Sequence, residues 1–203
     1  MGKLFYVIGK SSSGKDTIFQ SLLENKELGL KPLILYTTRP MRDGEEPGVQ
    51  YHFTDEEGLL ELEKAGKVIE LRSYDTVHGI WKYFTADTEE TDLNRDDYIT
   101  VGVLASFTAT RDYYGADRVI PVYIEVEDGE RLQRALDRER AQEEPRYAEM
   151  CRRFLADSED FSEEKIKEAG IERRFVNRNL KDCIEEICAC IREERKQEKD
   201  CFL

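Results

Sequence analysis

The sequence lacks any apolar stretch long enough to cross a membrane. A membrane-spanning helix needs about 18 to 20 mainly apolar residues, and no run in these 203 residues approaches that length. Residues 1–8 also lack the basic region, the apolar run and the cleavage site of a secretory signal peptide. We therefore expect a cytoplasmic protein with no membrane partner.

An excess of positive charge is absent as well. The chain holds 31 Lys and Arg against 44 Asp and Glu, which gives a net charge of −13. Because nucleic acids attract basic surfaces, this balance disfavours a nucleic-acid partner, and basic groups that meet an anionic ligand must be placed locally. Hydrophobic residues make up 39% and charged residues 37%, which is typical of a globular protein with a charged surface.

The five cysteines form no common metal pattern. Three of them, Cys183, Cys188 and Cys190, lie within eight residues, but their spacing fits no frequent zinc motif and no histidine is near. A reducing cytoplasm keeps thiols free, and free cysteine often behaves as a small buried apolar residue. We interpret these cysteines as structural thiols.

Short apolar runs alternate with segments of helical spacing along most of the chain. No internal repeat or low-complexity segment interrupts them. This alternation predicts an α/β fold with a mostly parallel sheet flanked by helices. The predicted strands are residues 3–8, 32–36, 98–104, 119–126 and 174–177, and the predicted helices are residues 16–28, 131–140, 147–161 and 180–196.

Residues 37–86 depart from this alternation and predict a small mixed subdomain. A capping box, Thr54 with Glu57 three residues later, opens a helix to about residue 65. Residues 68–71 and 79–85 read as strands. We expect one domain over residues 1–203, with an inserted acceptor-binding subdomain and a helical lid. The core is assigned to residues 1–36, 87–130 and 161–203, the subdomain to 37–86 and the lid to 131–160.

Residues 9–15 read GKSSSGK, which is the pattern G-x-x-x-x-G-K between a predicted strand and a predicted helix. Glycines let backbone N–H groups turn toward phosphate oxygens, and the helix N-terminus adds its positive end. Lys15 would reach the terminal phosphates. The pattern predicts an ATP-binding phosphate loop. The candidate ATP-binding residues are Gly9, Ser11, Ser12, Ser13, Gly14, Lys15, Asp16 and Thr17.

Asp16 stands where this pattern normally has Ser or Thr as a magnesium ligand. A carboxylate binds Mg²⁺ well, so Asp16 and the following Thr17 are the candidate metal ligands. Without the cation the Asp16 charge would repel phosphate. We therefore predict an unusually strong dependence on Mg²⁺, with ATP as co-substrate.

The segment from residue 36 to residue 53 combines two arginines, Arg39 and Arg42, with a Gly-Glu turn and with Tyr51. Arginine forks bind a phosphate monoester through paired hydrogen bonds. This composition indicates an anion clamp beside a tyrosine hydroxyl. The residues alone leave a second interpretation open, namely a solvated charged loop.

The same segment resembles the guanylate kinase family, whose pattern T-T-R-x-x-R-x-G-E-x-x-G-x-x-Y-x-F it matches at every fixed position. The resemblance implies a P-loop nucleoside monophosphate kinase of purine nucleotide metabolism, a transferase that moves the γ-phosphate of ATP to GMP. It implies nucleotide partners and a monomer or homodimer. The implied acceptor-binding residues are Thr37, Arg39, Arg42, Tyr51, Glu70, which would read guanine, and His78. The implied catalytic residues are Lys15 and the lid arginines Arg138, Arg140 and Arg153.

Three positions depart from the family pattern. Leu35 stands in place of a serine, Ile80 in place of a serine or threonine, and residues 98–110 hold no acidic residue. Two alternatives to GMP phosphorylation therefore stay open. One is a kinase of another phosphate-bearing acceptor such as ribose 1,5-bisphosphate, and the other is a catalytically weak binding module, which the intact phosphate loop disfavours.

Overall fold

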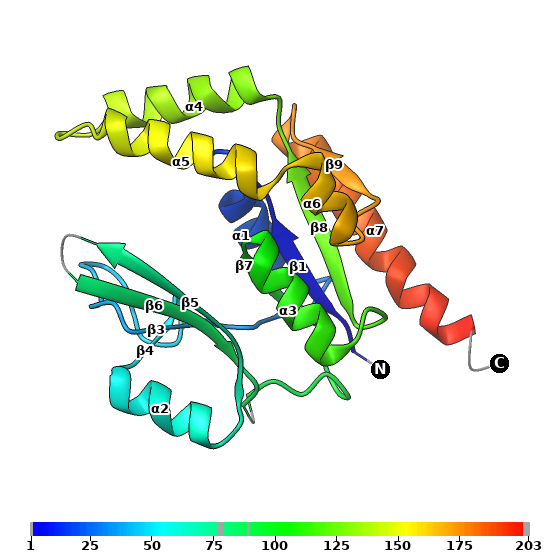
Figure 1. Ribbon diagram of the computed structural model, residues 1–203. Helices are drawn as coiled ribbons and strands as arrows, with labels where there is room; N and C mark the ends of the chain where they lie inside the picture. The colour runs from blue at the N-terminus through cyan, green and yellow to red at the C-terminus, as the bar shows by residue number, and fades with distance from the viewer. Residues whose placement is uncertain (1, 77–78, 89, 201–203) are drawn as a thin grey trace.

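A computed structural model describes residues 2–76, 79–88 and 90–200, with side chains to residue 196. In this part of the chain a parallel sheet of five strands, sheet A, forms the centre (Figure 1). Its order is β2-β7-β1-β8-β9, and every pair is parallel. The predicted α/β fold is confirmed. The strands are β1 Leu4–Ile8, β2 Lys31–Pro32, β7 Tyr98–Gly102, β8 Val119–Glu125 and β9 Arg174–Val176.

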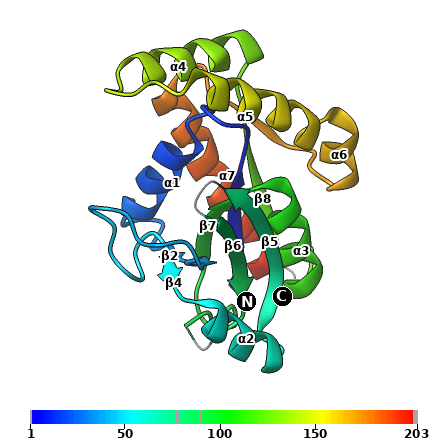
Figure 2. The same cartoon turned by 60° about the vertical axis from the view of Figure 1, so that its left-hand side comes forward.

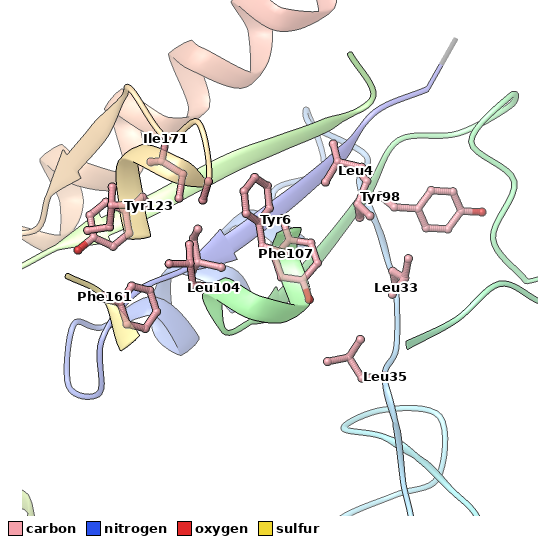
Figure 3. Packing of buried hydrophobic residues seen from close by; sticks show 14 of the residues in the cluster. Leu4, Tyr6, Leu33, Leu35, Tyr98, Leu104, Phe107, Tyr123, Phe161 and Ile171 are labelled. Carbon is pink, nitrogen blue, oxygen red and sulfur yellow. The ribbon is translucent and has the colours of Figure 1, made fainter. Parts of the chain in front are cut away.

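Helices cover both faces of sheet A because β1 is apolar on both sides. Leu4, Tyr6 and Ile8 point into one core cluster, which α3 and α6 also line, and Figure 3 shows Tyr6 packed beside Phe107 of α3. Phe5 and Val7 point into the other cluster, which α1 and α7 line. The helices are α1 Lys15–Glu24, α3 Leu104–Tyr114, α4 Asp128–Arg140, α5 Tyr147–Asp160, α6 Glu163–Glu168 and α7 Leu180–Asp200.

A second, mixed sheet, sheet B, has the order β4-β3-β6-β5. β3 pairs with β4 in parallel, whereas β6 is antiparallel to both β3 and β5. Sheet B and α2 extend from the core on one side, and α4 and α5 lie at the opposite end of the molecule in both views (Figures 1 and 2). The elements are β3 Tyr36–Thr37, β4 His52–Phe53, α2 Glu56–Lys64, β5 Val68–Thr76 and β6 Gly79–Ala86.

The single strand predicted over residues 32–36 is wrong. The chain pairs with β7 at Lys31–Pro32 and then leaves sheet A, and at Tyr36–Thr37 it pairs with sheet B. Leu33 and Leu35 between them are buried in the core cluster that contains Tyr6. The apolar residues of this run are therefore explained by the burial of a segment that connects the two sheets.

One strand end and one helix cap also differ from the predictions. The predicted strand 98–104 ends at Gly102, and α3 begins at Leu104. A side chain at Gly102 would place its Cβ 2.6 Å from the hydroxyl of Tyr6, so this close approach needs glycine. The cap of α2 is Asp55, whose carboxylate accepts from the Gly58 amide at 2.9 Å, and not Thr54.

The cysteines of α7 are packing residues. Cys183, Cys188 and Cys190 are buried in the core cluster that also contains Phe5 and Val7, and burial raises the pKa of the Cys183 thiol to about 11. Over the described ranges, no group of three or more His, Cys, Asp and Glu side chains is arranged to hold a metal ion. Within those same ranges no helix is both long and apolar enough to cross a bilayer.

Candidate phosphate-transfer site

The phosphate loop connects β1 to α1, and its glycines stand where a side chain would clash. A Cβ at Gly9 would lie 2.6 Å from the Ile124 carbonyl oxygen, and a Cβ at Gly14 would lie 2.6 Å from the Asn177 amide nitrogen. Gly14 has a φ of +86°, in the left-handed region that favours glycine. Asn177 donates to the Ser13 carbonyl at 2.8 Å. The loop is therefore shaped by its own glycines and held by β8 and the segment after β9.

Two buried hydroxyl groups of the loop make no hydrogen bond within the described part of the chain. They belong to Ser12 and Ser13. Buried polar groups are usually paired, so these two favour a bound anion or water at this place. The Lys15 ammonium is mostly buried and lies 3.7 Å from the Asp16 carboxylate.

Asp16 has the character of a ligand for a nucleotide-bound cation. Its side chain is 80% exposed in the first turn of α1, and Thr17 beside it is exposed as well. Mg²⁺ is commonly held by one or two carboxylates together with substrate phosphates. These residues fit a cation that arrives with ATP.

The lid contacts the phosphate loop through a buried ion pair. Arg131 of α4 is 1% exposed and donates to the Ser11 carbonyl and to Asp157 of α5, both at 3.2 Å, and to Asp128 at 2.9 Å. Its guanidinium also stacks over the Phe154 ring at 4.3 Å. The Asp157 carboxylate in turn accepts from the Ser11 amide at 2.8 Å. Arg131 and Asp157 thus hold α4 and α5 on the loop through both backbone groups of Ser11.

The predicted lid arginines take different positions. Arg138 and Arg153 line a small cavity together with Ser11 and Ser12, so both lie next to the phosphate loop. Arg140 is exposed and lies 4.0 Å from the carboxylate of Asp137 on its own helix. The structure therefore brings two of the three to the loop.

In the predicted clamp, Arg39 is buried, with 3% of its surface exposed. Its two terminal nitrogens donate to the Glu45 carboxylate at 2.7 and 2.5 Å. The guanidinium lies 5.2 Å from the Tyr51 ring centre and 5.3 Å from that of Phe53. Glu45 also accepts from the Arg42 amide at 2.8 Å, while the Arg42 side chain is exposed. One arginine is thus fixed and the other is presented to solvent.

The hydroxyls of the clamp have different surroundings. Thr37 donates to the Lys82 carbonyl at 2.8 Å and accepts from the Arg39 amide at 3.2 Å, so it holds the turn in shape. Burial and the neighbouring Tyr83 raise the pKa of Tyr51, and Arg39 and Arg72 oppose the rise. The charge of Asp16 also acts on Tyr51. Tyr51 is thus half-buried beside the Arg39 guanidinium.

Glu70 of β5 is almost fully buried and accepts three hydrogen bonds. Thr85 donates at 2.8 Å, and Arg72 donates at 2.9 and 3.2 Å. Of the other predicted acceptor residues, His78 lies outside the described residues. Ile80, which stands at a base-contacting position of the family pattern, is 62% exposed.

Sequence reasoning missed the partners of these charged groups. Arg72, Arg131 and Asp157 were not predicted, because no local motif distinguishes them from surface charges of a strand or a lid helix. Glu45 could have been found, since it stands in the Gly-Glu turn of the clamp pattern.

The Glu45–Arg39 pair predicts a change of stability in acid. The hydrogen bonds from Arg39 lower the pKa of Glu45 from 4.5 to about 2. A carboxyl whose pKa falls on folding stabilises the protein above its unfolded pKa, and this contribution is lost as the pH falls from about 4.5 to about 2. We expect the free energies of unfolding of the wild type and of Glu45→Gln to converge over this range in urea titrations. A constant difference down to about pH 3 would contradict the assignment.

Comparison with known proteins gives a consistent picture. A family model described as guanylate kinase matches residues 1–93. The guanylate kinase of Vibrio cholerae is 40% identical over 70 residues, which are 34% of this chain and 34% of that protein. The guanylate kinase of Methylobacillus flagellatus is 29% identical over 201 residues, 96% of this chain and 90% of that protein. The match of higher identity thus spans about a third of the Vibrio cholerae protein, and the match of lower identity spans nearly the whole length of the Methylobacillus flagellatus protein.

A solved structure extends the comparison to the fold. The crystal structure of guanylate kinase from Anaplasma phagocytophilum matches with a TM-score of 0.63 and 21% identity, covering 95% of this chain and 86% of that one. The two chains share their fold over nearly the full length.

Proposed function

We propose that this chain is a member of the guanylate kinase family, whose model matches residues 1–93, and that it transfers the γ-phosphate of ATP to GMP and forms ADP and GDP. The observation that carries the proposal is the presence of two anion sites in one chain. These are the phosphate loop with its unpartnered Ser12 and Ser13 hydroxyls and the clamp built on the fixed Arg39. A donor phosphate and an acceptor phosphate would occupy one site each.

On the donor side, the loop amides and Lys15 hold the ATP phosphates. Asp16 and Thr17 would hold Mg²⁺ together with those phosphates, and the cation would further neutralise their charge. Asp16 carries a negative charge at a phosphate site, so the cation is needed to make the site attractive to ATP. Activity should therefore be lost when EDTA removes the metal.

On the acceptor side, residues 37–86 bind GMP. Arg39 is oriented by Glu45, the exposed Arg42 can close over the phosphate, and the Tyr51 hydroxyl can donate to it. A phosphate oxygen of GMP attacks the γ-phosphorus of ATP, and the bond from that phosphorus to the bridging oxygen of ADP breaks. The attacking oxygen is already nucleophilic, so the site needs no general base.

Residues 131–160 act as the lid. Arg138 and Arg153 line the cavity beside Ser11 and Ser12, where their charges would neutralise the phosphoryl group in transfer. Closure over the loop would exclude water and prevent ATP hydrolysis. A cytoplasmic location and a monomeric or homodimeric state complete the proposal.

A coupled assay of ADP release tests the activity. With ATP and Mg²⁺ we expect kcat/KM for GMP to exceed that for AMP, UMP, CMP and ribose 1,5-bisphosphate by about a hundredfold or more. Reactions without acceptor and reactions with EDTA are the controls. Turnover of another acceptor without turnover of GMP would overturn the proposal, and so would ATP hydrolysis that no acceptor accelerates.

A further inference from the structure

Glu70 and Arg72 form a charged pair on one face of β5. They are two residues apart in a strand, so their side chains project to the same side. The Arg72 Nε donates to one Glu70 oxygen at 2.9 Å and its Nη2 donates to the other at 3.2 Å. The Arg72 side chain is 18% exposed and the Glu70 side chain 8%. The guanidinium is thus oriented by its neighbour, with one edge fixed.

Glu70 is nearly saturated as an acceptor. A carboxylate offers about four acceptor positions, and Arg72 and Thr85 together use three. A guanine base presents both a ring N–H and an amino group along its pairing edge. Glu70 has room for only one of these while its present bonds stay intact, so another group is needed to recognise the base.

Arg72 has donors available for that task. A guanidinium carries five N–H groups, and among the described residues only Glu70 receives hydrogen bonds from this one. Arg72 also lines a cavity of about 800 Å³ between β5, α3 and α6, whose lining is apolar at Val103, Leu104 and Ala105 and includes charged residues of α6. A planar base could rest on such a surface with its polar edge toward the guanidinium.

Resting on the proposed function, we propose that Arg72 is a specificity-determining residue that donates to O6 and N7 of the acceptor guanine, with Glu70 orienting its fork. Guanine presents O6 and N7 as adjacent acceptors, which matches two parallel N–H donors. Adenine presents an amino donor beside N7, so the same fork would meet a donor and be left unpaired. Arg72 supplies the polar contact that the exposed Ile80 does not make.

The test compares GMP with 7-deaza-GMP, which lacks only the N7 acceptor, in the wild type and in Arg72→Met. In the wild type, kcat/KM for GMP should exceed that for 7-deaza-GMP by about tenfold. In Arg72→Met, kcat/KM for GMP should fall by about ten- to a hundredfold, and the preference over 7-deaza-GMP should disappear. The KM for ATP should not change.

Arg95→Met is the matched control, since Arg95 is 81% exposed, and it should keep both the activity and the preference. Thermal unfolding of each variant shows that the fold is intact. If Arg72→Met weakened GMP and 7-deaza-GMP equally, Arg72 would serve only to position Glu70, and the inference would be overturned. Equal use of both substrates by the wild type would overturn it without any variant. A wild type that does not phosphorylate GMP would instead refute the proposed function.

Discussion

Replacing Lys15 by Met should lower kcat for phosphoryl transfer by about a thousandfold or more. Lys15 follows the left-handed Gly14 at the start of α1, so its ammonium is carried to the phosphate loop by the turn itself. Phosphoryl transfer depends on positioning and on neutralisation of charge, and few other groups contribute. Methionine keeps the length of the side chain and its apolar contacts while it removes the charge.

Single-turnover kinetics would measure this effect, with Lys26→Met as the matched control. Lys26 is exposed just beyond the C-terminal end of α1, so its loss removes the same charge at the opposite end of the helix from the loop. The control should keep wild-type kcat. If Lys15→Met kept kcat within about tenfold of the wild type, the loop would not stabilise the transition state in the way that its pattern requires.

Replacing Arg131 by Met should lower the free energy of unfolding by about 3 kcal/mol or more. The guanidinium, which is itself 1% exposed, joins Asp128, Asp157 and the Ser11 carbonyl. Its removal leaves the mostly buried Asp157 without its cation. Breaking a buried pair by removing one partner is costly, because the other charge stays desolvated.

Urea titration at neutral pH would measure the loss, and Arg152→Met provides the comparison. Arg152 pairs with Glu149 on the surface of α5, and its side chain is 66% exposed. Exposed pairs contribute about 0–1 kcal/mol, so this variant should be nearly as stable as the wild type. Equal stabilities of the two variants would mean that the lid contact adds nothing to folding.

The elements of sheet A that have strong local signals were predicted well. β1 and β8 are β-rich runs with adjacent turn or helix signals, and their burial follows from their composition. α3 was missed because its sequence, LASFTATRDYY, is rich in β-branched and aromatic residues, which are weak helix formers. Its helical state is decided by packing, since Leu104 and Phe107 fill the core against β1.

Candidate site residues were predictable where one segment contains the whole pattern. The phosphate loop and the clamp are continuous in sequence, and their function needs residues at fixed spacing. The Arg131–Asp157 pair, by contrast, joins two helices whose charges look like those of any solvated surface. Only the tertiary fold shows that Arg131 is buried. Likewise, only the geometry of β5 shows that Arg72 donates two hydrogen bonds to Glu70.

If ATP binds the phosphate loop as proposed, the contact between Asp157 and the Ser11 amide would make α5 a competitor of the nucleotide. An N–H group has one proton to donate, and in this structure it goes to a carboxylate at 2.8 Å. A phosphate oxygen bound by the same amide would have to exchange with that carboxylate, one anion for another. Charge-assisted hydrogen bonds contribute about 1.5–3 kcal/mol. The net free energy of ATP binding would therefore be reduced by the cost of breaking the hydrogen bond between the Ser11 amide and Asp157. Binding of a phosphate to the loop would then weaken the contact of α5 with the loop, and this contact would weaken phosphate binding to the same extent.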